Sequence, residues 1–193
     1  MQVLAYVAGL AVCFTVLRQV PHQSRIITGL LALMWSVNGI GYHGLFFSQI
    51  NPAAYLFAAL FLAEALVLLV IGFVVSDLVF KLHRPPWSAL GVALVVFSMV
   101  IYPSWGWLAG HRYPATPVFG VAPCPTTIFT IGVLLLGSWQ KVRWLLVLPV
   151  LWAAIGGTAA ILMAVPQDYG LIVAGLIAIA SVFVRRRRWS QHK

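Results

Sequence analysis

The sequence predicts an all-α, polytopic transmembrane helix bundle of about seven spans, with its N-terminus outside and its C-terminus in the cytoplasm. The 193 residues are 62% hydrophobic and 8% charged, with a mean hydropathy of +1.00, whereas a soluble domain is about a quarter charged. A helix satisfies its own backbone in lipid and needs roughly 20 apolar residues to cross it. We therefore expect a single integral membrane domain over residues 1–193 with short loops.

The first three predicted spans cover residues 3–17, 26–47 and 53–80. The first apolar run has no positively charged start and no small-residue cleavage site, so we expect a retained span rather than a signal peptide. Because this run is short for a span, we expect either a tilted helix that depends on its neighbours or a natural N-terminus that is longer. The turn SQINP separates the second span from the third, and KLHRPP follows the third.

The last four predicted spans cover residues 87–108, 126–139, 144–165 and 171–184. Aromatic residues near the end of the fourth span are typical of a helix that reaches the membrane interface. The next segment, AGHRYPATPVFGVAPCP, is rich in proline and cannot form a continuous helix. Pro125 then starts the fifth span, QKVR and PQDYG separate the last three, and RRRRWSQHK closes the chain.

The distribution of cations supports this topology. Of the twelve lysines and arginines, all except Arg112 fall on one side of the membrane in the predicted arrangement, as expected for the cytoplasmic side. The net charge of +9 therefore reflects span ends, and we expect no nucleic-acid partner. A cluster of arginines at the C-terminus would fix the last span and could bind anionic lipid, through Arg185, Arg186, Arg187 and Arg188.

Most of the polar residues that lie inside apolar sequence belong to the hairpin that runs from Trp35 to Glu64. Glu64 lies about 16 Å along the third span, close to mid-depth in a core of about 30 Å. Antiparallel packing across the short turn brings Trp35 and Asn38 to a similar depth. Glu64 is then either a proton or cation site, or a protonated acid hydrogen-bonded to Asn38 or the Trp35 indole.

His43 lies about one turn from the outer end of the second span, with Tyr42 beside it. Together with Glu64, Asn38 and Trp35, these two residues are our candidates for a proton, ion or substrate path. A lone histidine at this depth is more often an interface hydrogen-bonder than a metal ligand. The cofactor is left unknown. The nearby glycines predict the close approach of another helix, at Gly39, Gly41 and Gly44.

A second candidate site is an outer mouth made of His111, Arg112 and Cys124. Cys124 is predicted at a helix N-terminus, where the helix dipole and Arg112 would favour a thiolate or a bound anion. The favoured alternative is a structural cysteine in a loop that prolines make rigid. With His43, the histidine and cysteine of this mouth are weak candidates for a soft-metal or haem-type site. Asp168 and Tyr169 are predicted to cap the last span.

Two stretches resemble a known family. They read WSVNGIGYHGLFFSQINPAAYLFAALF and TPVFGVAPCPTTIFTIGVLLL. Both are similar to an uncharacterised family of bacterial multi-pass membrane proteins, the domain-of-unknown-function family number 6064, whose members are sometimes labelled permease. The resemblance covers nearly the whole chain and implies a multi-pass protein of the bacterial inner (plasma) membrane. It gives no residue a role.

The function that these observations favour is a permease-like transporter of a small molecule or ion, with Glu64 as the protonatable group. The alternative is a non-transporting accessory protein or a metal- or haem-binding membrane protein that uses the outer-face histidines and cysteine. An enzyme is the least favoured reading, because the sequence contains no paired acid and base groups and no nucleotide-binding, zinc-protease or Ser-His-Asp pattern. The substrate, the oligomeric state and any membrane partner stay open at this point.

Overall fold

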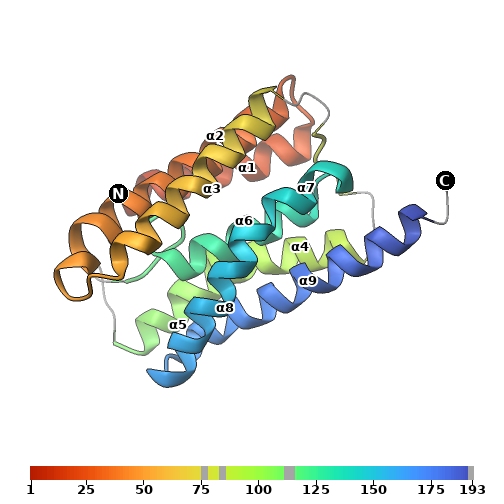
Figure 1. Cartoon of the computed structure of the whole chain (residues 1–193). Coiled ribbons are helices and arrows are strands. Elements are labelled where there is room, and N and C mark those ends of the chain that lie inside the picture. Colours follow the sequence, from red (N-terminus) through yellow and green to blue (C-terminus); the bar gives the residue numbers. More distant parts are fainter. Residues whose placement is uncertain (75–77, 83–85, 111–115, 191–193) are drawn as a thin grey trace.

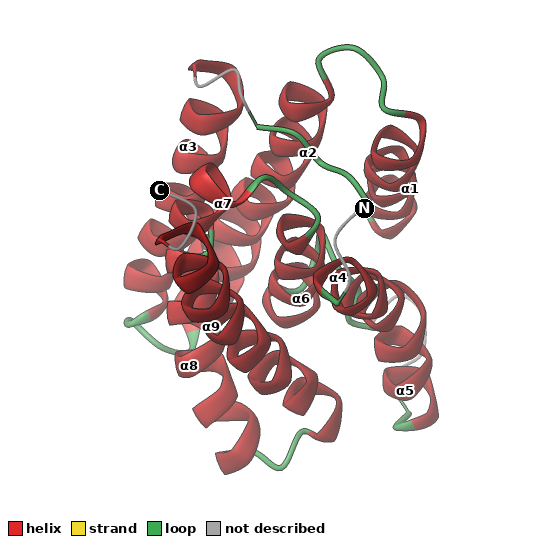
Figure 2. Cartoon of the chain, turned by 90° about the vertical axis from the view of Figure 1, so that its right-hand side faces the viewer, coloured by secondary structure: helices red, strands yellow, loops and turns green. Residues whose placement is uncertain are grey.

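The computed structural model describes residues 1–74, 78–82, 86–110 and 116–190, without the side chains of Trp139 and of residues 187–190. Within those ranges all regular structure is helical, and Figure 2 shows helices joined by loops. The helices, including π-helical and 3-10 segments marked η, are α1 (Gln2–Arg18), α2 (Gln23–Val37), η1 (Asn38–Phe46), η2 (Phe47–Gln49), α3 (Ala54–Val74), α4 (Trp87–Val96), η3 (Phe97–Ile101), α5 (Tyr102–Leu108), α6 (Pro123–Leu135), α7 (Trp139–Leu145), α8 (Val147–Leu162), η4 (Pro166–Asp168) and α9 (Tyr169–Ser190). The prediction of an all-α bundle is confirmed.

Four continuous helical stretches are long and apolar enough to cross a membrane: Gln23–Gln49, Ala54–Val74, Trp87–Leu108 and Pro166–Arg186. They match the predicted second, third, fourth and seventh spans. The helices α1, α6 and α8 are apolar but only 10–17 residues long. Large apolar side chains also face outward over much of the surface, for example Leu56, which is 71% exposed, and Leu162, which is 85% exposed. Such a surface is typical of a protein that faces lipid.

Helix α6 forms the centre of the bundle. In Figure 1 it lies between a group made of α1, α2 and α3 and a group made of α4, α8 and α9. Almost every residue of α6 is buried, including Thr126, Thr127 and Thr130, each with no exposed surface. A threonine hydroxyl can be buried in a helix because it donates to a backbone carbonyl in the preceding turn, as Thr127 does to Pro123 at 3.0 Å. The polar face of α6 therefore lies inside the molecule.

The predicted antiparallel pairing of the second and third spans agrees with the register of α2 and α3. A Cβ added to Gly39 would lie 3.2 Å from the Ala58 carbonyl oxygen, and the space beside Gly72 is filled by Thr28. A residue of the second span thus faces a residue of α3 when their two residue numbers add up to about 100, as those of Thr28 and Gly72 do. Of the three glycines predicted to admit a neighbouring helix, Gly39 does so, whereas Gly41 has open space beside it. Gly44 meets only the carbonyl of its own helix.

The predicted end of the third span at residue 80 is wrong. The described part of α3 ends at Val74, and Leu78–Phe80 is not helical. Phe80 forms an isolated antiparallel bridge with Gly137. The backbone N–H groups of Lys81 and Ser138 donate to the carbonyls of Leu136 and Val79, at 2.9 and 2.8 Å. Because these backbone groups are used by the 136–138 segment, they cannot extend the helix.

The bundle has two ends, which we name after one residue at each. The Lys81 end contains the Phe80–Gly137 bridge, to which Gln19 at the end of α1 is joined by a hydrogen bond of 2.7 Å to the Phe80 carbonyl. The Pro52 end contains the loop between η2 and α3, the start of α1 and the start of α9 (Figure 1). The position of each candidate site residue is described below relative to these two ends.

Candidate functional site

Glu64 is the most unusual side chain in the interior. It stands at the middle of α3, a helix of 21 residues, and has no exposed surface. Neither carboxyl oxygen has a hydrogen-bond partner among the described residues. An isolated ionised carboxylate in such a place is very costly, so desolvation favours the neutral carboxylic acid. The charge of the Glu64 carboxyl group therefore depends on whether water or another polar group enters the interior.

The two predicted partners of Glu64 donate their hydrogen bonds elsewhere. By the register of α2 and α3, Glu64 lies level with the segment from Trp35 to Asn38. The Trp35 indole donates to the Thr130 hydroxyl at 2.9 Å. The Asn38 amide donates to the Met34 carbonyl at 2.8 Å and to the Thr126 hydroxyl at 3.2 Å. The alternative in which Trp35 or Asn38 bonds a protonated Glu64 is thus not what the structure contains.

A π-helical segment, η1, brings Asn38 and His43 to the same side of the second span. At the α-helical angle of about 100° per residue, side chains five positions apart would point roughly 140° apart. In a π-helix the hydrogen bonds join residues five apart, so these side chains lie one above the other. Asn38 and His43 are both buried, at 0% and 1% exposure. The side-chain amide oxygen of Asn38, Oδ1, has no hydrogen-bond partner within the described structure. Isolated π-helical turns are frequent at functional sites.

Aromatic rings surround His43. The centroid of its imidazole lies 4.8 Å from that of Phe61, 5.0 Å from that of Trp152 and 5.7 Å from that of Phe57. No described residue bonds either imidazole nitrogen, nor the indole nitrogen of Trp152. Three helices, η1, α3 and α8, supply this cluster. The unbonded nitrogens of His43 and Trp152 can therefore bond a water molecule or a polar solute that reaches this cluster.

We refer to Trp35, Asn38, His43, Glu64, Thr126 and Thr130 as the interior polar cluster. It follows the face where α2 and η1 meet α3 and α6, from mid-depth toward the Pro52 end. Tyr42, the remaining candidate for the path, is 41% exposed, and its ring centroid is 5.0 Å from that of His43. Tyr42 therefore lies at the edge of the cluster rather than inside it.

A second group of polar side chains, which we call the carboxylate cluster, was missed by sequence reasoning. The Tyr102 hydroxyl donates to the Asp168 carboxylate, and the Cys124 thiol donates to the same carboxylate. The three residues come from α5, α6 and the end of η4. Tyr42 lies near Asp168 and Cys124. The predicted topology placed all four residues on the outer side, which was the signal that could have grouped them.

The predicted outer mouth is only partly described. His111 and Arg112 lie outside the described residues. Cys124 does stand in the first turn of α6, as predicted, and its neighbour among the described residues is Asp168. Both Cys124 and Cys13 are free thiols. Among the described residues, no group of three or more histidine, cysteine, aspartate or glutamate side chains could hold a metal ion.

The arginines at the C-terminus differ in their surroundings. The Arg185 side chain is 6% exposed and donates to the Gly137 carbonyl at 2.8 Å, just beyond the end of α6. A cation near the last carbonyls of a helix is stabilised by the helix dipole. Arg186 is exposed, and the side chains of Arg187 and Arg188 lie outside the described part of the chain. Arg185 thus ties α9 to the Lys81 end of the bundle.

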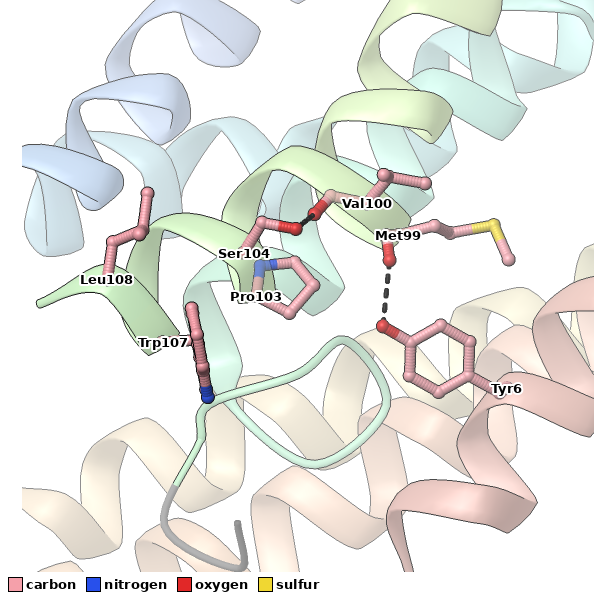
Figure 3. Close-up of a pocket in the computed structure, with 7 residues that line it drawn as sticks. All are labelled: Tyr6, Met99, Val100, Pro103, Ser104, Trp107 and Leu108. Carbon is pink, nitrogen blue, oxygen red and sulfur yellow. Dashed lines mark hydrogen bonds between the residues drawn. The ribbon is translucent and has the colours of Figure 1, made fainter. Parts of the chain in front are cut away.

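A groove on the surface lies away from both clusters. Figure 3 shows it between α1 and α5, with Tyr6 on one wall and Met99, Pro103 and Trp107 on the other. Its volume is about 620 Å³, and its lining is mostly apolar. The Tyr6 hydroxyl donates to the Met99 carbonyl at 2.7 Å. The groove opens onto the apolar outer surface and contains no titratable group besides Tyr6.

Comparison with known proteins identifies the family. The matching description is "Family of unknown function (DUF6064)", and the match extends over residues 1–193. Neither the curated proteins nor the solved structures contain a match to this chain. The family resemblance of the two motif stretches is thereby confirmed over the whole sequence. The chain belongs to the DUF6064 family of unknown function.

Proposed function

We propose that this protein is a permease-like membrane transporter that moves protons, alone or with a small solute, and that Glu64 is its protonatable group. The observation that carries the proposal is a buried carboxyl group at the middle of a membrane-length helix with both oxygens unbonded. Ionisable side chains at such a depth are costly and usually mark ion or substrate paths. The interior polar cluster supplies further unbonded atoms, on Asn38 and His43, along the same face.

The proposed topology has about seven spans, with the Pro52 end outside and the Lys81 end in the cytoplasm. The helices α1, α6 and α8 are short, but α6 is surrounded by other helices and need not match the bilayer by itself. The cations support this orientation, since all lysines and arginines except Arg112 belong to segments at the Lys81 end in this arrangement. We place the protein in the bacterial inner membrane on the same grounds.

In the proposed mechanism Glu64 alternates between the neutral acid and the carboxylate. The neutral acid is the stable form while the interior is dry. Water or a polar solute that reaches Asn38 and Glu64 would stabilise the carboxylate, and the released proton would leave toward the other side. Asn38 and His43 line the path with polar atoms that no described residue bonds. The proposal includes proton movement in the absence of any solute. Proton flux alone is therefore enough to test it.

The experiment reconstitutes purified protein into liposomes that contain a pH-sensitive dye and imposes a potassium diffusion potential. We expect wild-type vesicles to acidify at least about tenfold faster than protein-free vesicles. Glu64→Gln keeps the shape and removes the ionisable group, so it should return the rate to that of protein-free vesicles. Wild-type vesicles no faster than empty ones, or a Glu64→Gln rate equal to wild type, would overturn the proposal.

A further inference from the structure

The carboxylate cluster lies between the interior polar cluster and the Pro52 end. Asp168 is only half-buried, whereas Tyr102 behind it is 3% exposed. Asp168 immediately precedes α9, a helix of 22 residues, whose N-terminal dipole favours a negative charge. Two donors, the Tyr102 hydroxyl and the Cys124 thiol, also favour the carboxylate. Asp168 is therefore a half-buried carboxyl group that accepts hydrogen bonds, whereas no described residue bonds the Glu64 carboxyl group.

Polar groups continue from Asp168 toward Glu64. Tyr42 lies within electrostatic range of Asp168, Cys124 and Tyr102. Its ring is next to that of His43, whose two nitrogens are unbonded in the described structure. Asn38, one π-helical turn from His43, is at the level of Glu64 on the facing helix. These groups come from η1, α3, α5, α6 and η4, and they form one series from the half-buried end to mid-depth.

We infer that Asp168 is the proton-receiving carboxylate of the Pro52 end, which supplies Glu64 through Tyr42 and His43. The inference rests on the proposed function. The step is a proton transfer only. A proton from bulk water binds the Asp168 carboxylate, and the resulting acid gives the same proton, through hydrogen-bonded water and these side chains, to a Glu64 carboxylate that has released its own toward the Lys81 end. Unbonded polar atoms along the series are the groups that can hold such waters.

A purely structural role for the carboxylate cluster makes a different prediction. In that case the bonds to Tyr102 and Cys124 would only join α5 and α6 to the start of α9, and any side chain that accepts these bonds would serve. Asparagine retains a carbonyl oxygen that accepts them, but it cannot carry a proton. Glutamate retains the carboxylate. The pair Asp168→Asn and Asp168→Glu therefore separates proton transfer from packing.

The test uses the same dye-filled liposomes and the full chain. We expect Asp168→Asn to lower the acidification rate about tenfold or more at neutral pH, and Asp168→Glu to restore most of it. Cys13→Ser, in α1 and outside both clusters, is the control and should retain the wild-type rate. An Asp168→Asn rate equal to wild type, while Glu64→Gln remains inactive, would overturn this inference and leave the proposed function standing. Failure of wild type itself to exceed empty vesicles would overturn the proposed function instead.

If Asp168→Asn is not recovered as folded protein, Asp168→Glu decides through its pH profile. The described titratable groups that face Asp168 are Tyr102, Cys124 and Tyr42, and none of them is altered in this variant. A longer side chain moves the carboxyl group away from its two donors, so the external pH of half-maximal rate should shift. A profile identical to that of wild type would contradict the assignment of the transferred proton to Asp168.

Discussion

The helices α4 and α6 approach each other closely at Gly91 and Gly132, and this approach yields a sharp prediction about packing. A Cβ added to Gly132 would lie 2.8 Å from the Gly91 carbonyl oxygen and 3.0 Å from the Val95 nitrogen. Both neighbours are backbone atoms, so no side-chain rotation relieves the clash and the helices must separate. Gly132→Ala should therefore be costly. By contrast, no described atom lies within 4 Å of a Cβ added to Gly41, so Gly41→Ala is a control at a second helical glycine.

The difference between the two variants can be estimated. Overpacking of this kind costs about 1–3 kcal/mol, and a clash against backbone belongs at the upper end. Replacing a helical glycine with alanine gains up to about 1 kcal/mol of helix propensity, but this gain is common to both variants and cancels in their difference. We therefore expect Gly132→Ala to be less stable than Gly41→Ala by about 3 kcal/mol. For a chain of this size, each kcal/mol lowers Tm by roughly 2–4 °C.

The assay is thermal unfolding of detergent-purified protein, followed by the fluorescence of its eight tryptophans. The expected result is a Tm for Gly132→Ala that is lower than that of Gly41→Ala by roughly 6–12 °C. Equal Tm values, or a Gly132→Ala protein more stable than wild type, would refute the close approach of α4 and α6 and with it the central position of α6.

Two further predictions concern buried donors. Trp35→Phe removes the indole hydrogen bond to Thr130 and should lower the free energy of unfolding by about 1–3 kcal/mol. The control is Trp144→Phe, at a side chain that is 59% exposed, which should change the free energy of unfolding by less than about 0.5 kcal/mol in the same assay. Arg185→Met removes the charged bond to the Gly137 carbonyl and should cost about 1.5–3 kcal/mol, while Arg186→Met at an exposed position should cost little. An equal effect within either pair would contradict the bonding described for Trp35 or Arg185.

Composition and hydrophobic run length were sufficient to predict the fold class. An apolar run as long as α3 must satisfy its own backbone where it crosses lipid, as a helix does, so its helical character and approximate length follow from the sequence. Its end could not be predicted in the same way. The segment 78–80 is as apolar as a span, but Phe80 pairs with Gly137, and a contact across so much of the chain leaves no local signal. The register of α2 and α3 followed from the short turn between them.

The sequence was sufficient to select Glu64, Trp35 and Asn38 as candidates, but not to predict the hydrogen bonds that Trp35 and Asn38 make. The rarity of an acid in an apolar run pointed to Glu64 directly. The partners of Trp35 and Asn38 belong to α6, some 90 residues away in sequence, and α-helical periodicity could not anticipate the π-helical turn that brings Asn38 and His43 to one side. The sequence predicts only a helix cap at Asp168, because a residue just before a helix has that local explanation whether or not Tyr102 and Cys124 reach it.

The most direct measurement of the central claim is the reaction of the membrane-embedded protein with a hydrophobic carbodiimide, which adds to protonated carboxyl groups accessible from an apolar phase. The chain contains only three acidic side chains, so intact-mass and fragment spectra can assign any adduct. We predict one added reagent on Glu64, abolished in Glu64→Gln, and a wild-type proton flux that falls in proportion to labelling. An unlabelled Glu64, or labelling that leaves proton flux unchanged, would contradict the assignment of Glu64 as the protonatable group.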